Sequence, residues 1–229
     1  MKISLIVIAG LCLLQTVPVR AQAVGNPQNW CRNGIFPGEP VHFRLAVIVG
    51  MDGERIHFYD DTGENCPGGE SCRLKIYVIP GDVVIVTHSF GEWACCWYQP
   101  KQGDETVGWI RWERLKFKDE NKNPGLEAWV GEWAQYDTVI RIAPNPERGI
   151  LDVDGNAVWH GFRENTHVGR FEGSAMPQGD ILIISEGSGD EWNCSVRIQL
   201  LGRFLIVSDN FKCGGANVTF AGVYQRRSR

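Results

Sequence analysis

Cysteines are the residues of this chain whose spacing most directly limits their chemistry. The chain has eight, and seven of them follow the apolar N-terminal segment: Cys31, Cys66, Cys72, Cys95, Cys96, Cys194 and Cys213. No Cys-x-x-Cys pair occurs and the five histidines are scattered, so the pattern does not indicate a zinc site. Disulfides are the expected chemistry, and an odd count leaves at least one thiol outside them.

Cys194 and Cys213 are the clearest candidates for a bridge. Cys194 begins one expected strand, Cys213 lies just beyond the next, and Gly202 is near the turn between them. Antiparallel pairing brings such positions close together. A bridge here is expected to stabilise the fold by about 3 kcal/mol through restriction of the unfolded chain.

Of the five remaining cysteines, four can form two bridges and one is left unpaired. Cys31, Cys66, Cys72 and Cys95 allow three pairings, and spacing does not choose among them. Cys95 and Cys96 are adjacent, so on a strand they point to opposite faces and cannot share a partner. We predict Cys96 to be the unpaired thiol, either free or joined to a second chain.

Aromatic side chains crowd the stretch around Cys95 and Cys96. Trp93 and Trp109 are predicted to fill the core of a small β-domain. Trp97, Tyr98 and Trp112 are predicted to be exposed at its rim, where aromatic faces stack on sugar rings or pack a peptide. These three residues are the candidate ligand-binding residues.

Two acidic segments resemble metal loops but are predicted to be turns. Asp152-Val-Asp-Gly-Asn156 matches the start of a calcium loop, whose twelfth position should be acidic and is here Arg163. The same residues make an ordinary Asp-Gly hairpin turn. Asp60-Asp-Thr-Gly-Glu64 is predicted to be a solvated loop. Neither a metal nor a cofactor is predicted.

Catalytic motifs are missing from the sequence. It contains no Gly-x-Ser-x-Gly elbow, no His-Glu-x-x-His zinc motif and no Gly-rich phosphate loop. Cys194 as a nucleophile, with His160 or His167 as its base, would have to give up its expected disulfide. Carboxylate pairs suited to sugar hydrolysis are numerous, and no spacing singles one out. The chain is therefore predicted not to be an enzyme.

The N-terminus indicates export. Lys2 precedes an apolar run over Ile3–Leu14, and small residues follow at Ala21-Gln-Ala23. This is the pattern of a secretory signal peptide, here residues 1–23. The run is shorter than the roughly 20 apolar residues that a membrane-spanning helix needs. Leu11 before Cys12 disfavours a lipoprotein, so we expect a periplasmic or secreted protein without a stable membrane span.

Charge narrows the choice of partner. The net charge is −4, and the basic residues form no stripe of the kind that neutralises phosphates. Nucleic acid is therefore not an expected partner. The short basic tail Arg226-Arg-Ser-Arg229 is interpreted as a solvated chain end. An oligomeric state does not follow from the sequence.

Turn signals and short apolar runs predict an all-β protein. Turns are expected at Asp52-Gly53, Pro80-Gly81, Asp154-Gly155, Gly187-Ser-Gly189 and Gly214-Gly215. Runs of Val, Ile, Phe, Trp and Tyr lie between them, as in β-sandwiches and barrels. One short helix is possible over residues 125–133. The charged, Pro-Gly-ended segment at 117–125 predicts a boundary between domains at residues 24–118 and 126–229.

The first domain has a recognisable order of strands and turns. The stretch Tyr77-Val-Ile-Pro-Gly-Asp-Val-Val-Ile-Val86 reads as strand, turn and strand, and Glu92-Trp93 and Gly108-Trp109-Ile110 begin two more strands. Over residues 45–117 this order resembles the bacterial Src-homology-3-like domains of envelope proteins. The resemblance implies a small closed β-barrel and a binding module outside the cytoplasm.

The second domain is predicted to be an up-and-down barrel. Eight strands are expected, at 135–142, 148–152, 155–160, 168–173, 180–184, 193–200, 203–208 and 217–225, enough to close a barrel and remove its edges. Gly131-x-Trp133 and the late Arg226 are similar to the closing corner of a lipocalin-like barrel. That resemblance implies that the Trp plugs one end and the Arg stacks across it. The segment is shorter than a lipocalin, which predicts an interior filled by side chains.

A wider likeness spans most of the exported chain. It is carried by Cys194, Asp209-Asn210, Cys213-Gly-Gly215, Asn217-Val-Thr-Phe220 and Gly222-Val-Tyr224. These residues look similar to secreted proteobacterial proteins to which no activity is assigned.

The leading hypothesis is an extracytoplasmic, non-catalytic binding protein. The first barrel would bind cell-wall peptidoglycan or a peptide, as its resemblance implies. One alternative is a secreted inhibitor or interaction protein, for example one that blocks a lysozyme. Another is a carrier of a small hydrophobic ligand, which requires a cavity of roughly 300 Å³ or more near Trp133.

Overall fold

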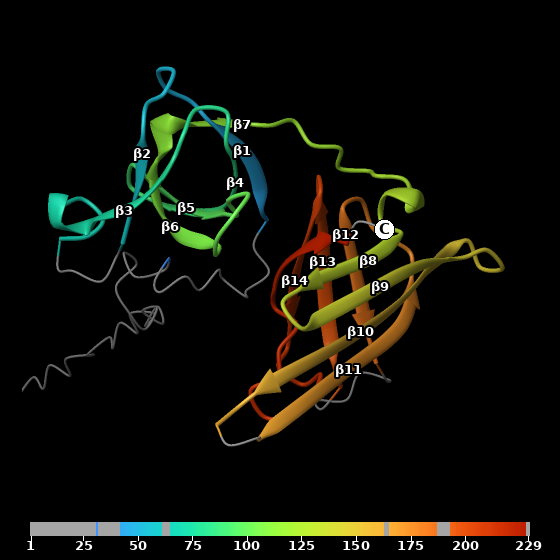
Figure 1. Cartoon of the computed structure of the whole chain (residues 1–229). Helices are drawn as coiled ribbons and strands as arrows, with labels where there is room; N and C mark the ends of the chain where they lie inside the picture. The colour runs from blue at the N-terminus through green and yellow to red at the C-terminus, as the bar shows by residue number, and fades with distance from the viewer. Residues whose placement is uncertain (1–30, 32–41, 61–64, 163–164, 187–192, 228–229) are drawn as a thin grey trace, which may run out of the picture.

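The computed structural model describes residues 31, 42–60, 65–162, 165–186 and 193–227, and these form an all-β fold (Figure 1). Its strands belong to one seven-stranded and one eight-stranded sheet, joined by a segment that runs from Phe117 to Gly131. The prediction of an all-β protein is confirmed. The predicted signal peptide at 1–23 and the turn at 187–189 lie outside the described residues, as does most of the acidic loop at 60–64.

The seven-stranded sheet is curled and has two free ends. Its strands are β1 (Arg44–Ile48), β2 (Ile56–Tyr59), β3 (Arg73–Val78), β4 (Val83–Phe90), β5 (Trp93–Tyr98), β6 (Thr106–Arg111) and β7 (Leu115–Phe117). They lie in the order β3-β2-β6-β5-β4-β1-β7, so β3 and β7 are the edge strands. The predicted turn at Pro80-Gly81 is present: Asp82 accepts a hydrogen bond from the Ile79 amide through its side chain and donates one back through its own amide.

The central strands of this sheet are buried on both faces. Alternate residues such as Ala46, Ile48 and Ala94 fill the inside of the curl. The residues between them, including Leu45 and Ile85, form a second cluster on the opposite face. Because successive side chains on a strand point to opposite faces, this face needs a cover of its own. The eight-stranded sheet supplies part of that cover.

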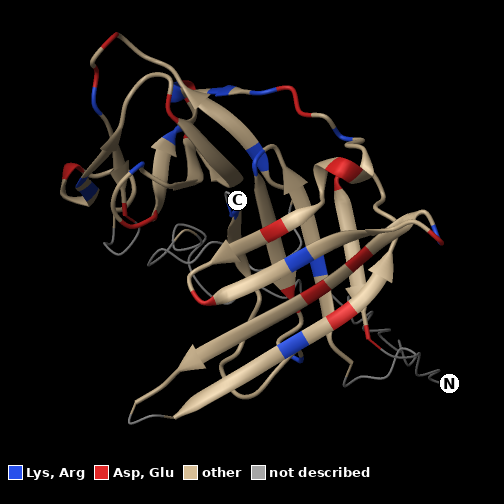
Figure 2. Ribbon diagram, turned by 45° about the vertical axis from the view of Figure 1, so that its right-hand side comes forward, with Lys and Arg blue, Asp and Glu red and all other residues tan. Residues whose placement is uncertain are grey.

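The eight-stranded sheet is a nearly closed antiparallel barrel. Its strands are β8 (Gly131–Gln135), β9 (Thr138–Asn145), β10 (Ile150–His160), β11 (Thr166–Ala175), β12 (Ile181–Ser185), β13 (Ser195–Leu201), β14 (Phe204–Asp209) and β15 (Gly222–Arg226). The order is β11-β10-β9-β8-β15-β14-β13-β12, a meander in which β8 pairs with β15. Acidic and basic residues are interspersed along β8 to β11 (Figure 2). The predicted number of eight strands is confirmed, although the strands expected at 148–152 and 155–160 are one strand, β10, and β8 was not among those expected.

Two expected boundaries in this barrel are wrong. Asp154-Gly155 is not a turn but lies inside the eleven-residue strand β10. Gly155 is needed there for packing, because a Cβ atom at this position would lie 2.1 Å from Cε1 of the buried Phe171. The short helix expected over 125–133 is a 3-10 turn at Leu126–Ala128 followed by β8. Glycine next to aspartate resembles a turn, and the sequence alone does not reveal the ring that requires it.

One end of the barrel is closed by Trp133 and Arg226. The Arg226 guanidinium carbon lies 4.5 Å from the centre of the Trp133 ring, and Arg226 donates a 2.5 Å hydrogen bond to the Ala128 carbonyl. Gly131, at φ +150°, leaves room for the arginine side chain. The expected stacking of Arg across Trp is therefore present. The described interior is filled by large buried side chains: Trp129, Trp133, Phe171, Phe220 and Tyr224.

The two sheets share a buried core. Leu201, Phe204, Ile206 and Val223 of the barrel join the outer-face cluster of the seven-stranded sheet. The fully buried Gln199 side chain accepts a hydrogen bond from the Phe43 amide at 3.3 Å. It donates to the Phe43 carbonyl at 3.2 Å and to Asp180 Oδ2 at 2.8 Å. The division into domains at 24–118 and 126–229 stays a prediction, although the strand sets do change between Phe117 and Gly131.

Three disulfides cross-link the described chain, between Cys31 and Cys95, Cys66 and Cys72, and Cys194 and Cys213. The predicted Cys194–Cys213 bridge is confirmed, and Cys96 is the unpaired thiol, as predicted. Three bridges indicate an oxidising, extracytoplasmic compartment. Within the described part of the chain, no helix has the length and apolar character to cross a membrane.

Cys96 is buried on the inner face of the curled sheet, where its Sγ donates to the Ala94 carbonyl. Burial raises the pKa of the Cys96 thiol, so it stays protonated. We expect a thiol reagent such as DTNB to leave the native, exported chain unmodified at pH 8 and to label one thiol after unfolding in guanidinium. The Cys96→Ala variant should give no label in either state. Stoichiometric labelling of the native chain would contradict this burial and reopen a link between chains through Cys96.

Candidate functional site

The structure corrects the expected position of Trp97. Its side chain is 3% exposed, and its ring meets that of Phe204 edge-on at 5.6 Å between centroids. The indole Nε1 donates to Glu105 Oε2 at 3.0 Å. The expectation of an exposed rim residue is wrong, because the face of β5 that carries Trp97 is covered by the barrel. Trp97 therefore joins the two sheets and cannot stack on a ligand in this state.

The other two candidates do not share a surface with Trp97: Tyr98 points to the opposite face of β5, and Trp112 lies beyond the end of β6. Tyr98 is half-buried, with its ring 6.5 Å from Phe58; burial, and then the charge and hydrogen bonding of Asp82, raise the pKa of its phenol. Trp112 lies in a 3-10 turn and is 42% exposed, with one face of its ring against Phe117. Of the three, Trp112 best fits an exposed stacking surface.

Trp112 borders a shallow hollow of about 420 Å³ on the seven-stranded sheet. Its lining is Ser89, Gly91, Glu92, Arg111, Trp112 and Glu113. Arg111 Nη1 contacts Glu92 Oε2 at 2.6 Å, and the Arg111 guanidinium lies 4.6 Å from the centre of the Trp93 ring. An exposed indole beside charged and hydroxyl groups is the kind of surface on which a sugar ring can stack and hydrogen-bond.

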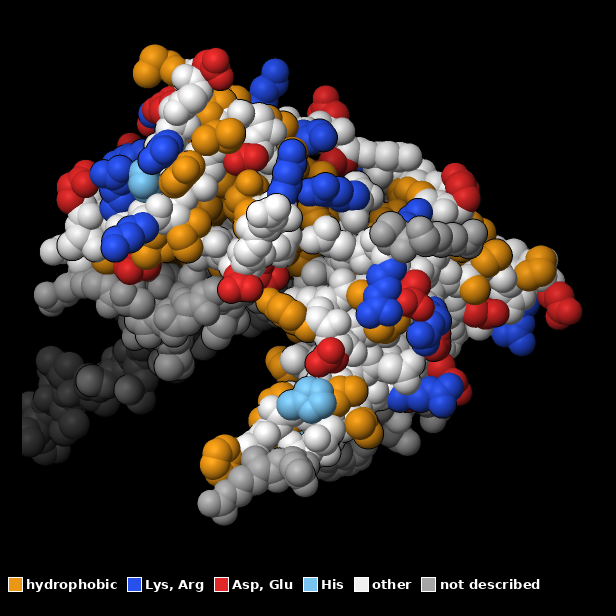
Figure 3. Space-filling model, viewed as in Figure 1, with side chains coloured by type: hydrophobic (Ala, Val, Ile, Leu, Met, Phe, Trp, Pro, Cys, Tyr) orange, Lys and Arg blue, Asp and Glu red, His pale blue; other side chains and the backbone are white. Residues whose placement is uncertain are grey.

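A second hollow continues from the first across β2 and β6. It has a volume of about 250 Å³ and shares Arg111 and Glu113 with the Trp112 hollow; its other lining residues are Glu54, Arg55, Ile56, His57, Tyr59, Arg73 and Arg114. Figure 3 shows Lys and Arg side chains gathered around a histidine over this part of the sheet. We call the side chains of Arg55, His57, Arg73, Lys75 and Tyr77 the cationic face.

Strand pairing brings the cationic face together. In the β2–β3 ladder, His57 lies opposite Tyr77, so both rings point to one side. Their centroids are 5.7 Å apart, and the Arg55 guanidinium lies 4.7 Å from the centre of the Tyr77 ring. His57 Nδ1 donates to the Leu74 carbonyl at 2.8 Å, which holds the imidazole beside β3.

The cations of this face differ from those around it in having no carboxylate partner. Arg111 pairs with Glu92, and Arg114 pairs with Glu54. In the described ranges, by contrast, no ion pair joins Arg55, Arg73 or Lys75 to an acidic group. Exposed guanidinium groups can bind carboxylates in a bidentate manner, and neighbouring aromatic rings add apolar contact. The cationic face is thus suited to an anionic ligand.

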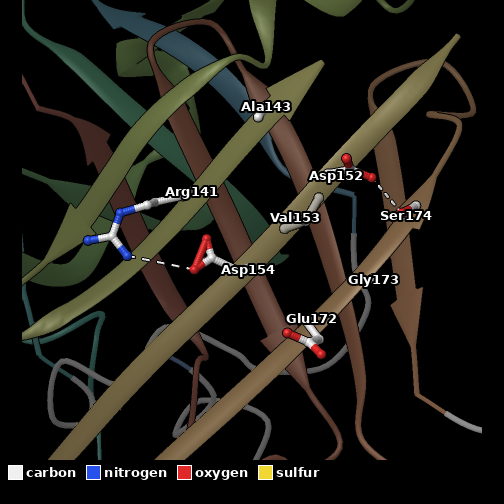
Figure 4. Close-up of a pocket in the computed structure, with 8 residues that line it drawn as sticks. All are labelled: Arg141, Ala143, Asp152, Val153, Asp154, Glu172, Gly173 and Ser174. Carbon is white, nitrogen blue, oxygen red and sulfur yellow. Dashed lines mark hydrogen bonds and ion pairs between the residues drawn. The ribbon is translucent and has the colours of Figure 1, made fainter. Parts of the chain in front are cut away.

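The outer face of the barrel offers a larger groove of a different character. One part, about 530 Å³, lies over β9, β10 and β11 and is lined by Arg141, Ala143, Asp152, Val153, Asp154, Glu172, Gly173 and Ser174 (Figure 4). A neighbouring part, about 840 Å³, shares Arg141 and Ala143 and extends to Arg226 and Arg227.

The charges of this groove pair with one another. Arg141 contacts Glu132 at 3.0 Å and Asp154 at 3.6 Å, and Arg170 contacts Glu172 at 2.7 Å. Ser174 Oγ donates to Asp152 at 2.5 Å; this bond and that from Asn145 hold the pKa of the Asp152 carboxyl below its usual range. The groove is therefore a self-neutralised sheet face, and it attracts a charged ligand less than the cationic face does.

Among the described residues, one group of side chains has the spacing of metal ligands, namely Asp60, Cys66 and Cys72. Its two sulfur atoms are joined in a disulfide and have no thiolate to offer a metal ion. Asp152 and Asp154, which resembled a calcium loop, are two residues apart on β10, and both take part in the outer-face pairing.

Sequence reasoning missed the cationic face although a signal for it was present. Arg55, His57 and Tyr59 alternate with Ile56 and Phe58, and Arg73-Leu-Lys-Ile-Tyr77 shows the same alternation. A period of two places the polar members of each run on one face of a strand. Two such runs close in sequence predict a polar, basic-aromatic sheet face if their strands pair.

The structure thus leaves two surfaces to consider, the cationic face with the Trp112 hollow and the barrel groove. Comparison of the chain with protein-family models, with curated proteins and with solved structures finds no match in any of the three.

Proposed function

We propose that this chain is an extracytoplasmic, non-catalytic binding protein whose cationic face binds carboxylate-bearing peptides, with the stem peptides of cell-wall peptidoglycan as the natural candidate. The single observation that carries the proposal is the absence of acidic partners for Arg55, Arg73 and Lys75 among the described residues. The neighbouring carboxylates of Glu54 and Glu92 are already paired, so the local charge favours an anion.

The Trp112 hollow supports a ligand that also carries sugar. It continues from the cationic face through Arg111 and Glu113, so one ligand can contact both surfaces. Peptidoglycan joins sugar rings to peptides with free carboxylates, which matches an indole beside a row of cations. The resemblance of residues 45–117 to bacterial Src-homology-3-like domains points in the same direction.

The proposal of a small-ligand carrier has less support. It needs a cavity near Trp133, and the described interior of the barrel is occupied by Trp129, Trp133, Phe171 and Tyr224. The Arg226–Trp133 corner supports the lipocalin-like resemblance as a matter of architecture. No feature of the described surface favours an inhibitor of lysozyme over a cell-wall binder.

Sedimentation with purified cell wall tests the proposal. We expect the exported chain to pellet with insoluble peptidoglycan, and the bound fraction to fall as salt screens the cations. The double variant Arg55→Glu/Arg73→Glu should bind at least about tenfold more weakly, which corresponds to about 1.4 kcal/mol. Lys101→Glu/Arg148→Glu is the matched control, because it changes net charge equally at exposed sites outside the cationic face.

Two results would sink the proposal. One is a wild-type chain that pellets no more than an unrelated periplasmic protein. The other is an equal loss of binding in both double variants, since that would assign the interaction to net charge rather than to this face.

A further inference from the structure

Strand β3 is an edge of the seven-stranded sheet, and its outer side carries no neighbour within the described ranges (Figure 1). Its ladder with β2 is itself interrupted, because the register shifts between His57 and Tyr59. At the start of the strand, the Arg73 amide donates to the Glu70 carbonyl. From Leu74 to Val78, no main-chain hydrogen bond outside the strand ladders is found among the described residues. The outer main-chain groups of β3 beyond Arg73 are therefore open to another chain, as at an edge strand.

The edge strand β11 of the barrel, by contrast, has hydrogen-bond partners along its outer side. Along β11, the Arg170 amide donates to the Cys213 carbonyl at 3.0 Å, and the Val168 carbonyl accepts from the Gly215 amide at 3.1 Å. Farther along, the Glu172 amide donates to the side chain of Glu186 at 2.8 Å. A loop and a carboxylate thus cover the edge of β11. The edge of β3 has no such cover among the described residues.

Beside its two cations, β3 exposes apolar side chains, which edge strands usually avoid. Ile76 is 49% exposed, Tyr77 is 38% exposed, and Ile79 just beyond the strand is 45% exposed. Ile76 and Tyr77 point to opposite faces of the strand. A strand added beside β3 would therefore meet an apolar side chain on each of its faces, as peptide recognition by strand addition requires.

The charges of β3 select which chain can be added. Arg73 and Lys75 lie on the same face as Tyr77 and have no acidic partner among the described side chains. A second copy of β3 would place like charges opposite each other, which is unfavourable. An acidic strand would instead place its carboxylates opposite these cations, so the edge discriminates between self-association and an acidic ligand.

We propose that the free edge of β3 binds an extended acidic peptide by strand addition, with carboxylates toward Arg73 and Lys75 and apolar side chains toward Ile76. This inference rests on the proposed function and narrows it: the peptide forms main-chain hydrogen bonds with β3 rather than lying across the cationic face as a flexible anion.

Calorimetric titration of the exported chain with an acetylated, amidated peptide of alternating Glu and Val tests this. We expect measurable binding by the Glu–Val peptide and none by a Lys–Val peptide of the same length. Two further peptides carry N-methyl groups on every Val or on every Glu. Because successive amides of an extended peptide point to opposite edges, each of these peptides lacks the N–H donors along one edge. At least one of them should bind about tenfold more weakly or worse, a loss of about 1.4 kcal/mol.

The Lys75→Glu variant provides a second arm, checked for folding by its thermal transition. Its affinity for the Glu–Val peptide should fall below detection and its affinity for the Lys–Val peptide should rise. The Lys101→Glu variant should bind both peptides as the wild type does. Amide hydrogen exchange across residues 73–78 of the wild-type chain should slow when the Glu–Val peptide is bound.

The outcomes separate the two proposals. Equal binding of both methylated peptides and the unmodified one, with unchanged exchange in β3, overturns strand addition and leaves anion binding by the cationic face intact. Absence of Glu–Val binding, together with full cell-wall binding by Arg55→Glu/Arg73→Glu, overturns both.

Discussion

Replacing Trp97 with alanine is expected to lower the free energy of unfolding by about 3–5 kcal/mol, the range found when a buried aromatic side chain is removed from a core. The ring is buried between the two sheets and meets Phe204 edge-on. Its removal leaves a void in the shared core and removes the indole N–H that donates a hydrogen bond to Glu105. Urea denaturation followed by far-ultraviolet circular dichroism measures this loss.

Trp112→Ala is the matched control, because it removes the same side chain from an exposed position. We expect it to change the free energy of unfolding by no more than about 0.5 kcal/mol. Phe204→Ala in the barrel should be strongly non-additive with Trp97→Ala, by about 0.5–3 kcal/mol, since the two rings touch. Equal stability of the Trp97 and Trp112 variants would show that the sheets do not share a core in solution.

The Cys31–Cys95 bridge is expected to be the most stabilising of the disulfides. It joins residues 64 apart in sequence, and a closed loop of that length restricts the unfolded chain by about 4 kcal/mol. The Cys66–Cys72 bridge joins residues only 6 apart, for which the same relation gives about 2 kcal/mol. Removal of the Cys31–Cys95 bridge should therefore lower the free energy of unfolding more than removal of the Cys66–Cys72 bridge.

Paired variants measure the difference. Cys31→Ala/Cys95→Ala and Cys66→Ala/Cys72→Ala remove both sulfurs of a bridge, so no new thiol is left to react. Guanidinium denaturation of each should give the larger loss for the first pair. A larger loss for the Cys66–Cys72 pair would mean that this bridge fixes native packing in the loop before β3 rather than merely shortening the unfolded chain.

Much of the architecture could be predicted because it depends on local patterns. Alternating apolar residues and Gly-containing turns indicate strands wherever one face is buried. The Cys194–Cys213 bridge follows from the geometry of neighbouring antiparallel strands, and the Arg226–Trp133 contact from a recognisable corner. Each of these depends on residues within one sheet.

What could not be predicted depends on contacts between sheets. A period of two shows that Trp93, Cys95 and Trp97 share a face, but it does not show what covers that face. The prediction for Trp97 treated the first sheet as an isolated body with a solvent-facing outer surface. In the fold, Phe204 occupies that surface, and Gln199 bonds across the same junction to Phe43. The cationic face is a different case, because it lies within one sheet: its two alternating runs give a signal, but only the pairing of β2 with β3 brings them together.

The opposed positions of Cys95 and Cys96 on β5 bear on how the protein matures. In an unfolded chain both sulfurs are about equally near Cys31, so early oxidation can join Cys31 to either of them. Pairing of β5 with β4 and β6 turns Cys95 toward Cys31 and Cys96 inward. The protonated inward thiol cannot then attack the finished bridge. The alternation of side chains along β5 thus determines which sulfur reaches Cys31. Formation of the correct disulfide is therefore expected to follow formation of the sheet.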